Sequence, residues 1–114
     1  MKILWISPWF GNYRIPVYEN LNKLCSGNFY LICSEENTSE LVRGKLKAVL
    51  GNHAIVMSGE QRMTMGSDES DFANSALVIK KQPGLYKAVK SVEADVIIVD
   101  ETSMVDMYLM NYLL

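Results

Sequence analysis

The sequence predicts a three-layer α/β fold, with a parallel sheet of four or five strands and helices on both faces. Two short runs, residues 3–6 and 96–99, are almost entirely apolar, as expected for strands that are buried on both faces. Segments with helical spacing of apolar residues alternate with these strand-like runs, which favours parallel strands joined by right-handed crossovers. We expect the first strand to be central and residues 1–114 to form a single domain.

The first unit, residues 1–25, reads as a strand, a glycine-containing loop and a helix. The strand covers residues 2–7, and Gly11 and Asn12 then supply a turn. Pro16 suits the beginning of a helix, because its fixed φ fits there and its missing N–H needs no partner. In open α/β sheets such a loop lies at the carboxyl end of a central strand, where ligands bind.

The remaining elements follow in order. Further strands are expected over residues 29–34, 53–57, 76–79 and 94–100. Helices are expected from a cap at Thr38 or Ser39 to about residue 50, from Pro83 through Val92, and over residues 104–114. Residues 58–75 show no sustained periodicity and are interpreted as a long loop.

Polar and charged residues follow several of the predicted strands. Because parallel strands end at the same edge, this edge should gather residues 7–14, 34–36, 57–59 and 100–103. Arg14 adds positive charge where the helix dipole favours an anion. Asp100 and Glu101 form a pair of carboxylates that either binds an acceptor hydroxyl or acts as a base, the alternative being an exposed strand end. His53 begins a strand and therefore belongs to the opposite edge.

The composition excludes several classes of protein. The net charge is −2 and the basic residues are scattered, which argues against a nucleic-acid partner. No apolar run reaches the roughly 18 residues that a membrane span needs, and no signal peptide is recognisable, so we expect a cytoplasmic protein. The two cysteines, Cys25 and Cys33, are expected to be buried thiols, and we expect neither a metal nor a cofactor.

One stretch resembles a known family. Residues 13–21, Tyr-Arg-Ile-Pro-Val-Tyr-Glu-Asn-Leu, match the run Tyr-Arg-x-Pro-x-aromatic-x-x-Leu, and the chain opens with Met-Lys-Ile-Leu. Together they resemble the start of GT-B glycosyltransferases, especially the retaining group that includes many bacterial cell-surface sugar transferases. Residues 90–99 are similar to the family's helix-to-strand step before its later strand.

The resemblance implies a Rossmann-like domain that holds the acceptor, a glycan or a lipid-linked sugar. A second, C-terminal Rossmann-like domain would hold most of the nucleotide-sugar donor. The chain would then be the N-terminal part of a hexosyltransferase-like enzyme of polysaccharide biosynthesis, inactive alone, in the cytoplasm or at the inner face of the membrane with peripheral membrane contact. The sequence departs from the family where the fifth strand often ends near a His, because it has Asp100-Glu101-Thr102 there.

The resemblance also suggests roles for the first loop. Gly11, Asn12 and Arg14 would approach the donor phosphates, because a small residue lets the backbone come close and N–H groups with a cation stabilise a departing diphosphate. The acceptor would be bound by three aromatic residues: Trp9, Phe10 and Tyr13.

One alternative stays open for the function, and another is disfavoured. Neither G-x-G-x-x-G nor a phosphate loop occurs, but a small non-catalytic nucleotide-binding or interaction module remains an alternative. A signalling receiver domain is disfavoured, because no acidic cluster follows the first strand. The predicted helix over residues 104–114 is apolar on most faces, so we expect self-association through residues 103–114 as a two-fold dimer.

Overall fold

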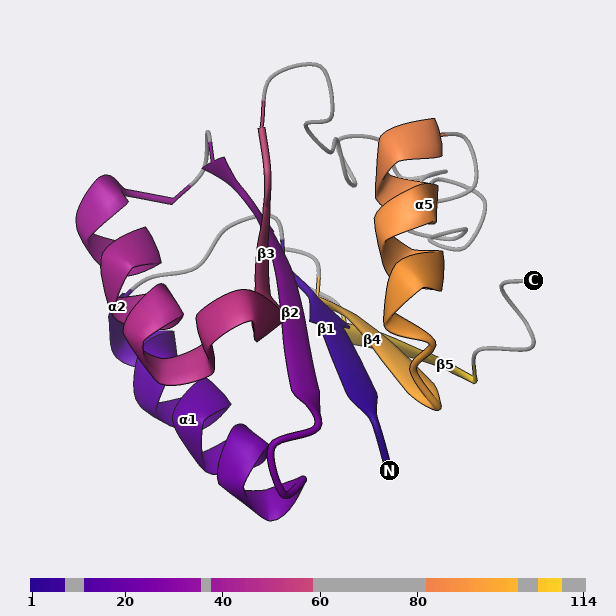
Figure 1. Ribbon diagram of the computed structural model, residues 1–114, viewed down its shortest axis with the longest axis horizontal. Helices are drawn as coiled ribbons and strands as arrows, with labels where there is room; N and C mark the ends of the chain where they lie inside the picture. Colours follow the sequence, from indigo (N-terminus) through magenta and orange to yellow (C-terminus); the bar gives the residue numbers. More distant parts are fainter. Residues whose placement is uncertain (8–11, 36–37, 59–81, 101–104, 110–114) are drawn as a thin grey trace.

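The computed structural model describes residues 1–7, 12–35, 38–58, 82–100 and 105–109. Its strands form one sheet of five, in the order β3-β2-β1-β4-β5 (Figure 1). Their bounds are β1 Ile3–Ile6, β2 Phe29–Ser34, β3 Ala54–Met57, β4 Val96–Asp100 and β5 Val105–Leu109. The first strand is central, which confirms the prediction from its apolar sequence.

Four of the strands are parallel. β1 pairs in parallel with β2 on one side and with β4 on the other, and β2 pairs in parallel with β3. β5 pairs with β4 in the antiparallel direction. The predicted α/β fold with a parallel sheet is therefore confirmed, with one antiparallel strand added at its edge.

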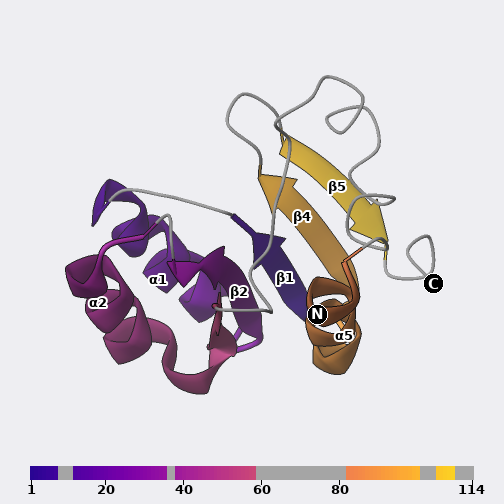
Figure 2. The same ribbon diagram turned by 90° about the horizontal axis from the view of Figure 1, so that it is seen from above.

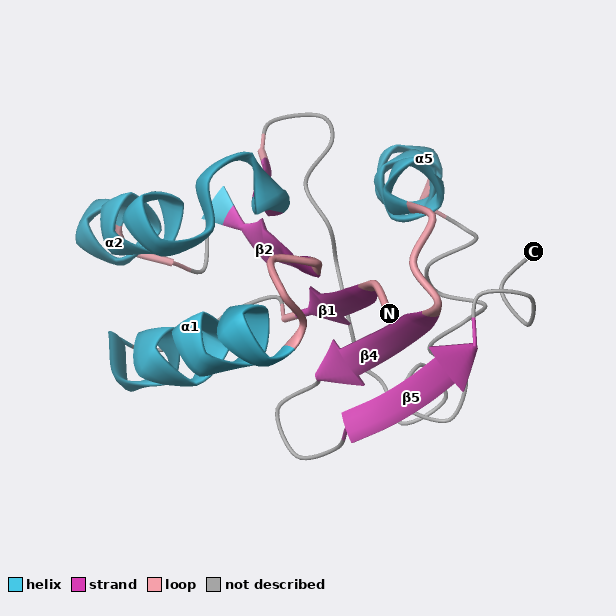
Figure 3. Ribbon diagram, turned by 60° about the horizontal axis from the view of Figure 1, so that its bottom comes forward, coloured by secondary structure: helices cyan, strands magenta, loops and turns pink. Residues whose placement is uncertain are grey.

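The helices cover both faces of this sheet, as predicted (Figures 2 and 3). The α-helices are α1 Ile15–Leu24, α2 Glu40–Leu50 and α5 Pro83–Val92, and two short 3₁₀ helices are η1 Asn12–Arg14 and η3 Gly51–His53. α1 and α2 lie on one face of the sheet, whereas α5 lies on the other (Figure 2). This is the arrangement that right-handed crossovers produce when the chain winds in both directions from β1.

Each face has its own apolar core. Under α1 and α2, the core is centred on Tyr18, Phe29 and Leu46, all fully buried, and the Tyr18 and Phe29 rings stack with centroids 5.8 Å apart. Under α5, alternate residues of β1 and β4, such as Leu4 and Ile97, pack against the helix. Because successive strand residues point to opposite faces, a strand packed on both must be apolar throughout, as β1 and residues 96–99 of β4 are.

Local signals begin and end the helices where the sequence predicts. The Ser39 side chain caps α2 by accepting a hydrogen bond from the backbone N–H of Val42. Gly51 ends the same helix with φ of 60°, a left-handed value that favours glycine. Pro16 lies in the first turn of α1 and Pro83 begins α5, where neither proline breaks an intrahelical hydrogen bond.

The helix predicted over residues 104–114 is wrong within the described part of that segment, because Val105–Leu109 forms β5. The register pairs Val96 with Leu109 and Asp100 with Val105, so β5 covers the whole edge of β4. An apolar β4 without this neighbour would leave a row of backbone N–H and C=O groups unpaired, and that non-local pairing outweighs local helix preference. The strand predicted over residues 76–79, and the predicted loop from residue 59 onward, lie outside the described residues.

Candidate functional site

The sheet has one topological switch point, between β1 and β4. From β1 the chain proceeds outward through β2 and β3 on one side, whereas β4 lies on the other side. Ligands of open α/β sheets bind outside the carboxyl ends of the strands at such a point. Ile6 pairs with Val99, so Ser7 and Asp100, the next residue of each segment, lie side by side at this edge.

The start of α1 lies at the same edge. η1 leads directly into α1 with Arg14 as the N-cap residue, so the positive end of the helix dipole is at the carboxyl edge of β1. Arg14 is half-buried, whereas Tyr13 is 72% exposed. Asn12 is linked to the neighbouring helix α2, because Lys45 Nζ donates a hydrogen bond of 3.3 Å to its Oδ1.

The residues proposed from the sequence are thus partly brought together. Asn12, Tyr13 and Arg14 share the short η1 turn, and Asp100 ends the strand beside β1. The remaining ones lie outside the described residues: Trp9, Phe10, Gly11 and Glu101.

Two serines also lie at this edge and were not predicted as site residues. Ser7 and Ser34 follow or end the apolar runs of β1 and β2, and their exposed fractions are 1% and 0%. Ser34 Oγ has no hydrogen-bond partner within the described part of the chain, although its carbonyl oxygen accepts a 2.7 Å bond from Thr38 Oγ1. A serine that ends an otherwise apolar strand is the sequence signal that points to such a position.

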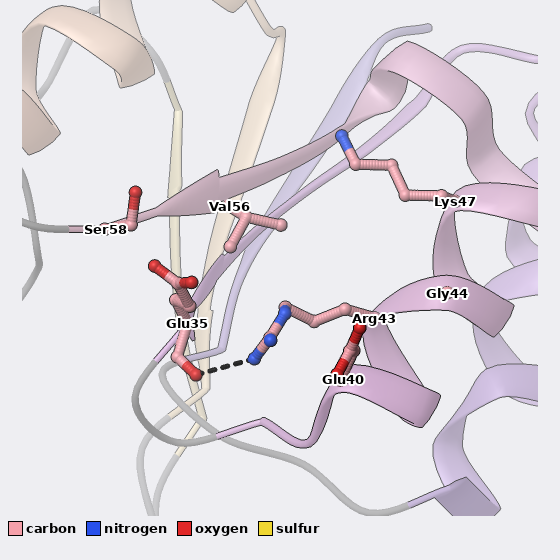
Figure 4. A pocket seen from close by; sticks show the side chains of 7 residues that line it. All are labelled: Glu35, Glu40, Arg43, Gly44, Lys47, Val56 and Ser58. Carbon is pink, nitrogen blue, oxygen red and sulfur yellow. Dashed lines mark hydrogen bonds between the residues drawn. The ribbon is translucent and has the colours of Figure 1, made fainter.

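A groove beside α2 opens two strands away from the switch point, outside the ends of β2 and β3. We call it the α2 groove; its volume is about 330 Å³ and it is lined by Glu35, Glu40, Arg43, Gly44, Lys47, Val56 and Ser58 (Figure 4). Arg43 is fixed at its edge, because Nη1 donates to the carbonyl oxygen of Glu35 at 2.8 Å and to that of Thr38. The other flank of α2 carries a second, shallower hollow of about 660 Å³, lined by Glu40, Leu41, Gly44, Lys45 and Ala48.

The amino edge of the sheet carries the single histidine. The ring of His53 stacks on that of Tyr30, and its Nδ1 lies 3.2 Å from the carbonyl oxygen of Phe29. Lys2 Nζ lies 5.5 Å from the centroid of the Tyr30 ring and donates to the carbonyl oxygen of Val92. This confirms that His53 belongs to the edge opposite the switch point.

The cysteines do not form a reactive site. Cys33 is fully buried in β2, and burial raises the pKa of its thiol to about 11, although the Thr38 hydroxyl and the charges of Lys47 and Arg43 oppose this shift. Cys25, at the end of α1, is half-buried rather than buried, so the expectation of two buried thiols holds for Cys33 alone. Within the described ranges, no group of three or more metal-ligating side chains occurs.

Comparisons with known proteins leave the chain without an assigned family. No family model, no curated protein and no solved structure matches it. Among the described residues, no helix is long and apolar enough to cross a membrane.

Proposed function

We propose that this domain is the acceptor-side half of a GT-B glycosyltransferase, which moves a sugar from a nucleotide-sugar donor to a glycan or lipid-linked acceptor. The observation that carries the proposal is the position of the Tyr-Arg-x-Pro stretch. Tyr13 and Arg14 lie at the start of α1, at the carboxyl edge of the central strand and beside the switch point. Ligands bind at that place in open α/β sheets.

The start of α1 has the chemistry that a departing diphosphate requires. Backbone N–H groups of the first helical turn are directed toward the carboxyl edge, and the helix dipole adds positive potential there. Arg14 adds a full positive charge at the same point, and its half-buried position weakens solvent screening. Developing negative charge on the leaving group would be stabilised by these groups, together with the backbone at Gly11 and Asn12.

The acceptor would be bound beside them. Tyr13 is 72% exposed, so the face of its ring is available for the C–H face of a sugar. Trp9 and Phe10 would extend this aromatic surface. Asp100, at the end of β4 next to Ser7, and Glu101 after it would accept a hydrogen bond from the acceptor hydroxyl or remove its proton.

Most of the donor contacts would come from a second Rossmann-like domain C-terminal to this one. We therefore propose that the 114-residue chain has no transferase activity by itself. We place the proposed reaction in the cytoplasm or at the inner face of the membrane, with peripheral membrane contact.

The direct test is a transfer assay on the protein encoded by the complete reading frame, with radiolabelled UDP-, GDP- and dTDP-sugars. Arg14→Ala should lower the transfer rate by about 10²-fold or more, by analogy with removal of one stabilising donor at an oxyanion. Lys23→Ala is the matched control, because Lys23 is an exposed cation at the other end of α1, paired with Glu19 at 3.7 Å. A reading frame without a second α/β domain, or an Arg14→Ala enzyme with full activity, would overturn the proposal.

Calorimetric titration of the 114-residue chain separates this proposal from the alternative, a self-sufficient nucleotide-binding module. We expect no binding of micromolar strength for UDP-, GDP- or dTDP-sugars, because no complete phosphate motif is present. Micromolar binding by this chain alone would favour the module and contradict the proposal.

A further inference from the structure

Gly44 lies in the middle of α2, where the fold gives no reason for a glycine. A glycine inside a helix costs roughly 1 kcal/mol relative to alanine. A Cβ at Gly44 would meet no atom within 4 Å, so packing does not exclude a side chain among the described residues. The residue lines the α2 groove and presents no side chain to it (Figure 4).

The polar groups of the groove gather at one end. Glu35 and Ser58 extend from the ends of β2 and β3, and the guanidinium of Arg43 reaches toward them from α2 (Figure 4). Two backbone carbonyls hold Arg43 Nη1, which fixes the plane of the guanidinium and leaves Nε and Nη2 for a ligand. Within the described chain no ion pair joins Glu35 to Arg43, so both acceptors and donors remain available at this end.

Besides Glu40, the rest of the groove is lined by Val56, Gly44 and Lys47. The Val56 side chain extends from β3, and Gly44 lies on α2 across the groove from it (Figure 4). The Lys47 side chain extends from α2 toward the strands, where its Nζ donates to the carbonyl oxygen of Ala54, so its methylene groups are available to line the groove. The groove therefore combines a polar end with a small apolar surface, made of the Val56 side chain, the Gly44 backbone and the methylene groups of Lys47.

Charge disfavours ionic ligands. Two carboxylates, Glu35 and Glu40, balance the two cations, Arg43 and Lys47. A phosphate bound to Arg43 would lie close to the Glu35 carboxylate, and like charges about 4 Å apart repel by about 4 kcal/mol at an effective dielectric constant of 20. A divalent cation would lack ligands, because the described residues hold no group of three metal-ligating side chains.

We infer that the α2 groove is a binding site for one neutral sugar ring. Such a ring has a C–H face, which suits Val56, Gly44 and the Lys47 stem, and a hydroxyl edge whose groups both donate and accept hydrogen bonds. Glu35 accepts, Arg43 donates and Ser58 does both. The site lies two strands away from the switch point, so a sugar bound here would be an additional unit of the acceptor. This assignment to the acceptor rests on the proposed glycosyltransferase function, whereas sugar binding itself does not.

The test is an NMR titration of the ¹⁵N-labelled 114-residue chain with methyl glycosides of glucose, galactose, mannose and N-acetylglucosamine. At least one glycoside should bind with millimolar affinity and shift the amide signals of Gly44, Val56 and Ser58. Sodium phosphate and magnesium chloride, tested in parallel, should not shift them. If no glycoside perturbs these signals, or if phosphate or magnesium does so instead, the inference is overturned.

Two helix variants separate binding from stability. Gly44→Ala should raise the melting temperature by a few degrees, because alanine favours the helix, yet weaken glycoside binding at least about tenfold by filling the groove. Ala48→Gly is the matched control: Ala48 is an exposed residue one turn later that borders the second hollow instead, so the melting temperature should fall and the affinity should not change. Equal affinity for Gly44→Ala and the parent chain would overturn the inference.

A third variant addresses the polar end. Glu35→Gln keeps the size of the side chain but replaces one carboxylate oxygen by a donor, and should weaken glycoside binding without lowering stability, since Glu35 is exposed. Glycoside binding in the groove together with failure of the transfer assay would overturn the glycosyltransferase proposal alone. An active transferase whose α2 groove binds none of the glycosides would overturn the groove assignment alone.

Discussion

The imidazole ring of His53 stacks on the phenol ring of Tyr30, with the ring centroids 3.9 Å apart and the planes inclined by 17°. This contact joins η3 to β2 at the amino edge of the sheet, and the Nδ1 of His53 adds a contact of 3.2 Å to the carbonyl oxygen of Phe29. The histidine thus joins the segment immediately before β3 to the start of β2. Its role is structural, on the edge away from the proposed chemistry.

We expect His53→Ala to lower the free energy of unfolding by about 1–2 kcal/mol, the sum of a stacked aromatic pair and one hydrogen bond. Urea denaturation monitored by circular dichroism measures this change. Asn52→Ala is the control, because Asn52 is an exposed residue of the same 3₁₀ helix. An equal effect of both substitutions would show that the stacking contributes nothing.

Cys33 gives the fold a dependence on alkaline pH. Burial disfavours the thiolate and raises the pKa of the Cys33 thiol from its ordinary value of 9.0 to about 11. The folded chain therefore keeps its proton where the unfolded chain has lost it. The stabilisation that the neutral thiol provides is complete below pH 9.0 and is lost as the pH rises through about 11.

Two measurements check this prediction. Unfolding free energies from about pH 8 to about pH 10.5 should fall more steeply for the parent chain than for Cys33→Ala, which lacks the titrating thiol. At about pH 8, a thiol reagent should modify the half-buried Cys25 in the folded chain and leave Cys33 unmodified until urea is added. Rapid modification of Cys33 in a folded Cys25→Ser variant would contradict the assignment.

Ser34 and Thr38 are suited to a comparison, because both are buried and, among the described residues, only the Thr38 hydroxyl is hydrogen-bonded. Thr38 Oγ1 donates to the Ser34 carbonyl at 2.7 Å, whereas Ser34 Oγ has no partner among the described residues. An unsatisfied buried polar group costs about 1–3 kcal/mol, so Ser34→Ala should raise the free energy of unfolding by about 1 kcal/mol. Thr38→Ala should lower it by about as much. A destabilised Ser34→Ala variant would show that the hydroxyl has a partner within the folded protein.

The sequence predicts most of the fold because its local and non-local signals agree. Residues 3–6 and 96–99 are apolar throughout, which marks strands buried on both faces, and Pro16, Ser39, Gly51 and Pro83 delimit the helices. The last segment is different. Val105–Leu109 mixes good strand formers with residues that also suit a helix, so its state depends on the free edge of β4, which no local pattern reveals.

The two candidate sites also differ in how far the sequence predicts them. Strand ends can be counted along the sequence, so Ser7, Asp100 and the start of α1 are predictable neighbours once the sheet is parallel. The α2 groove is not predictable in this way, because Glu35, Arg43 and Ser58 meet only after β2, α2 and β3 have packed. Gly44 was the available signal: a glycine inside an amphipathic helix lowers stability, and its place on the groove offers a reason for that loss.

The last prediction concerns self-association through residues 103–114. The structure gives this association a different basis from the one that the sequence suggests. In the described segment the basis is no longer an unpaired apolar helix, because Val105–Leu109 is one of the two edge strands of the described sheet. An edge strand can pair with the same strand of a second copy, and antiparallel pairing of this kind produces a two-fold dimer. Asp106 lies within β5, and a charge on an edge strand opposes such pairing, so we expect weak association.

Sedimentation equilibrium at micromolar to millimolar concentration measures this association. The parent chain should approach a dimer only at the upper end of this range, and Asp106→Val should shift the equilibrium toward the dimer, because it removes the charge from the edge and adds a strong strand former. Met107→Lys should do the opposite, since a second charge on the strand further opposes pairing. Circular dichroism of each variant shows whether the fold is kept. If the parent chain and a folded Asp106→Val variant are both monomers at every concentration, β5 does not associate and the prediction is wrong.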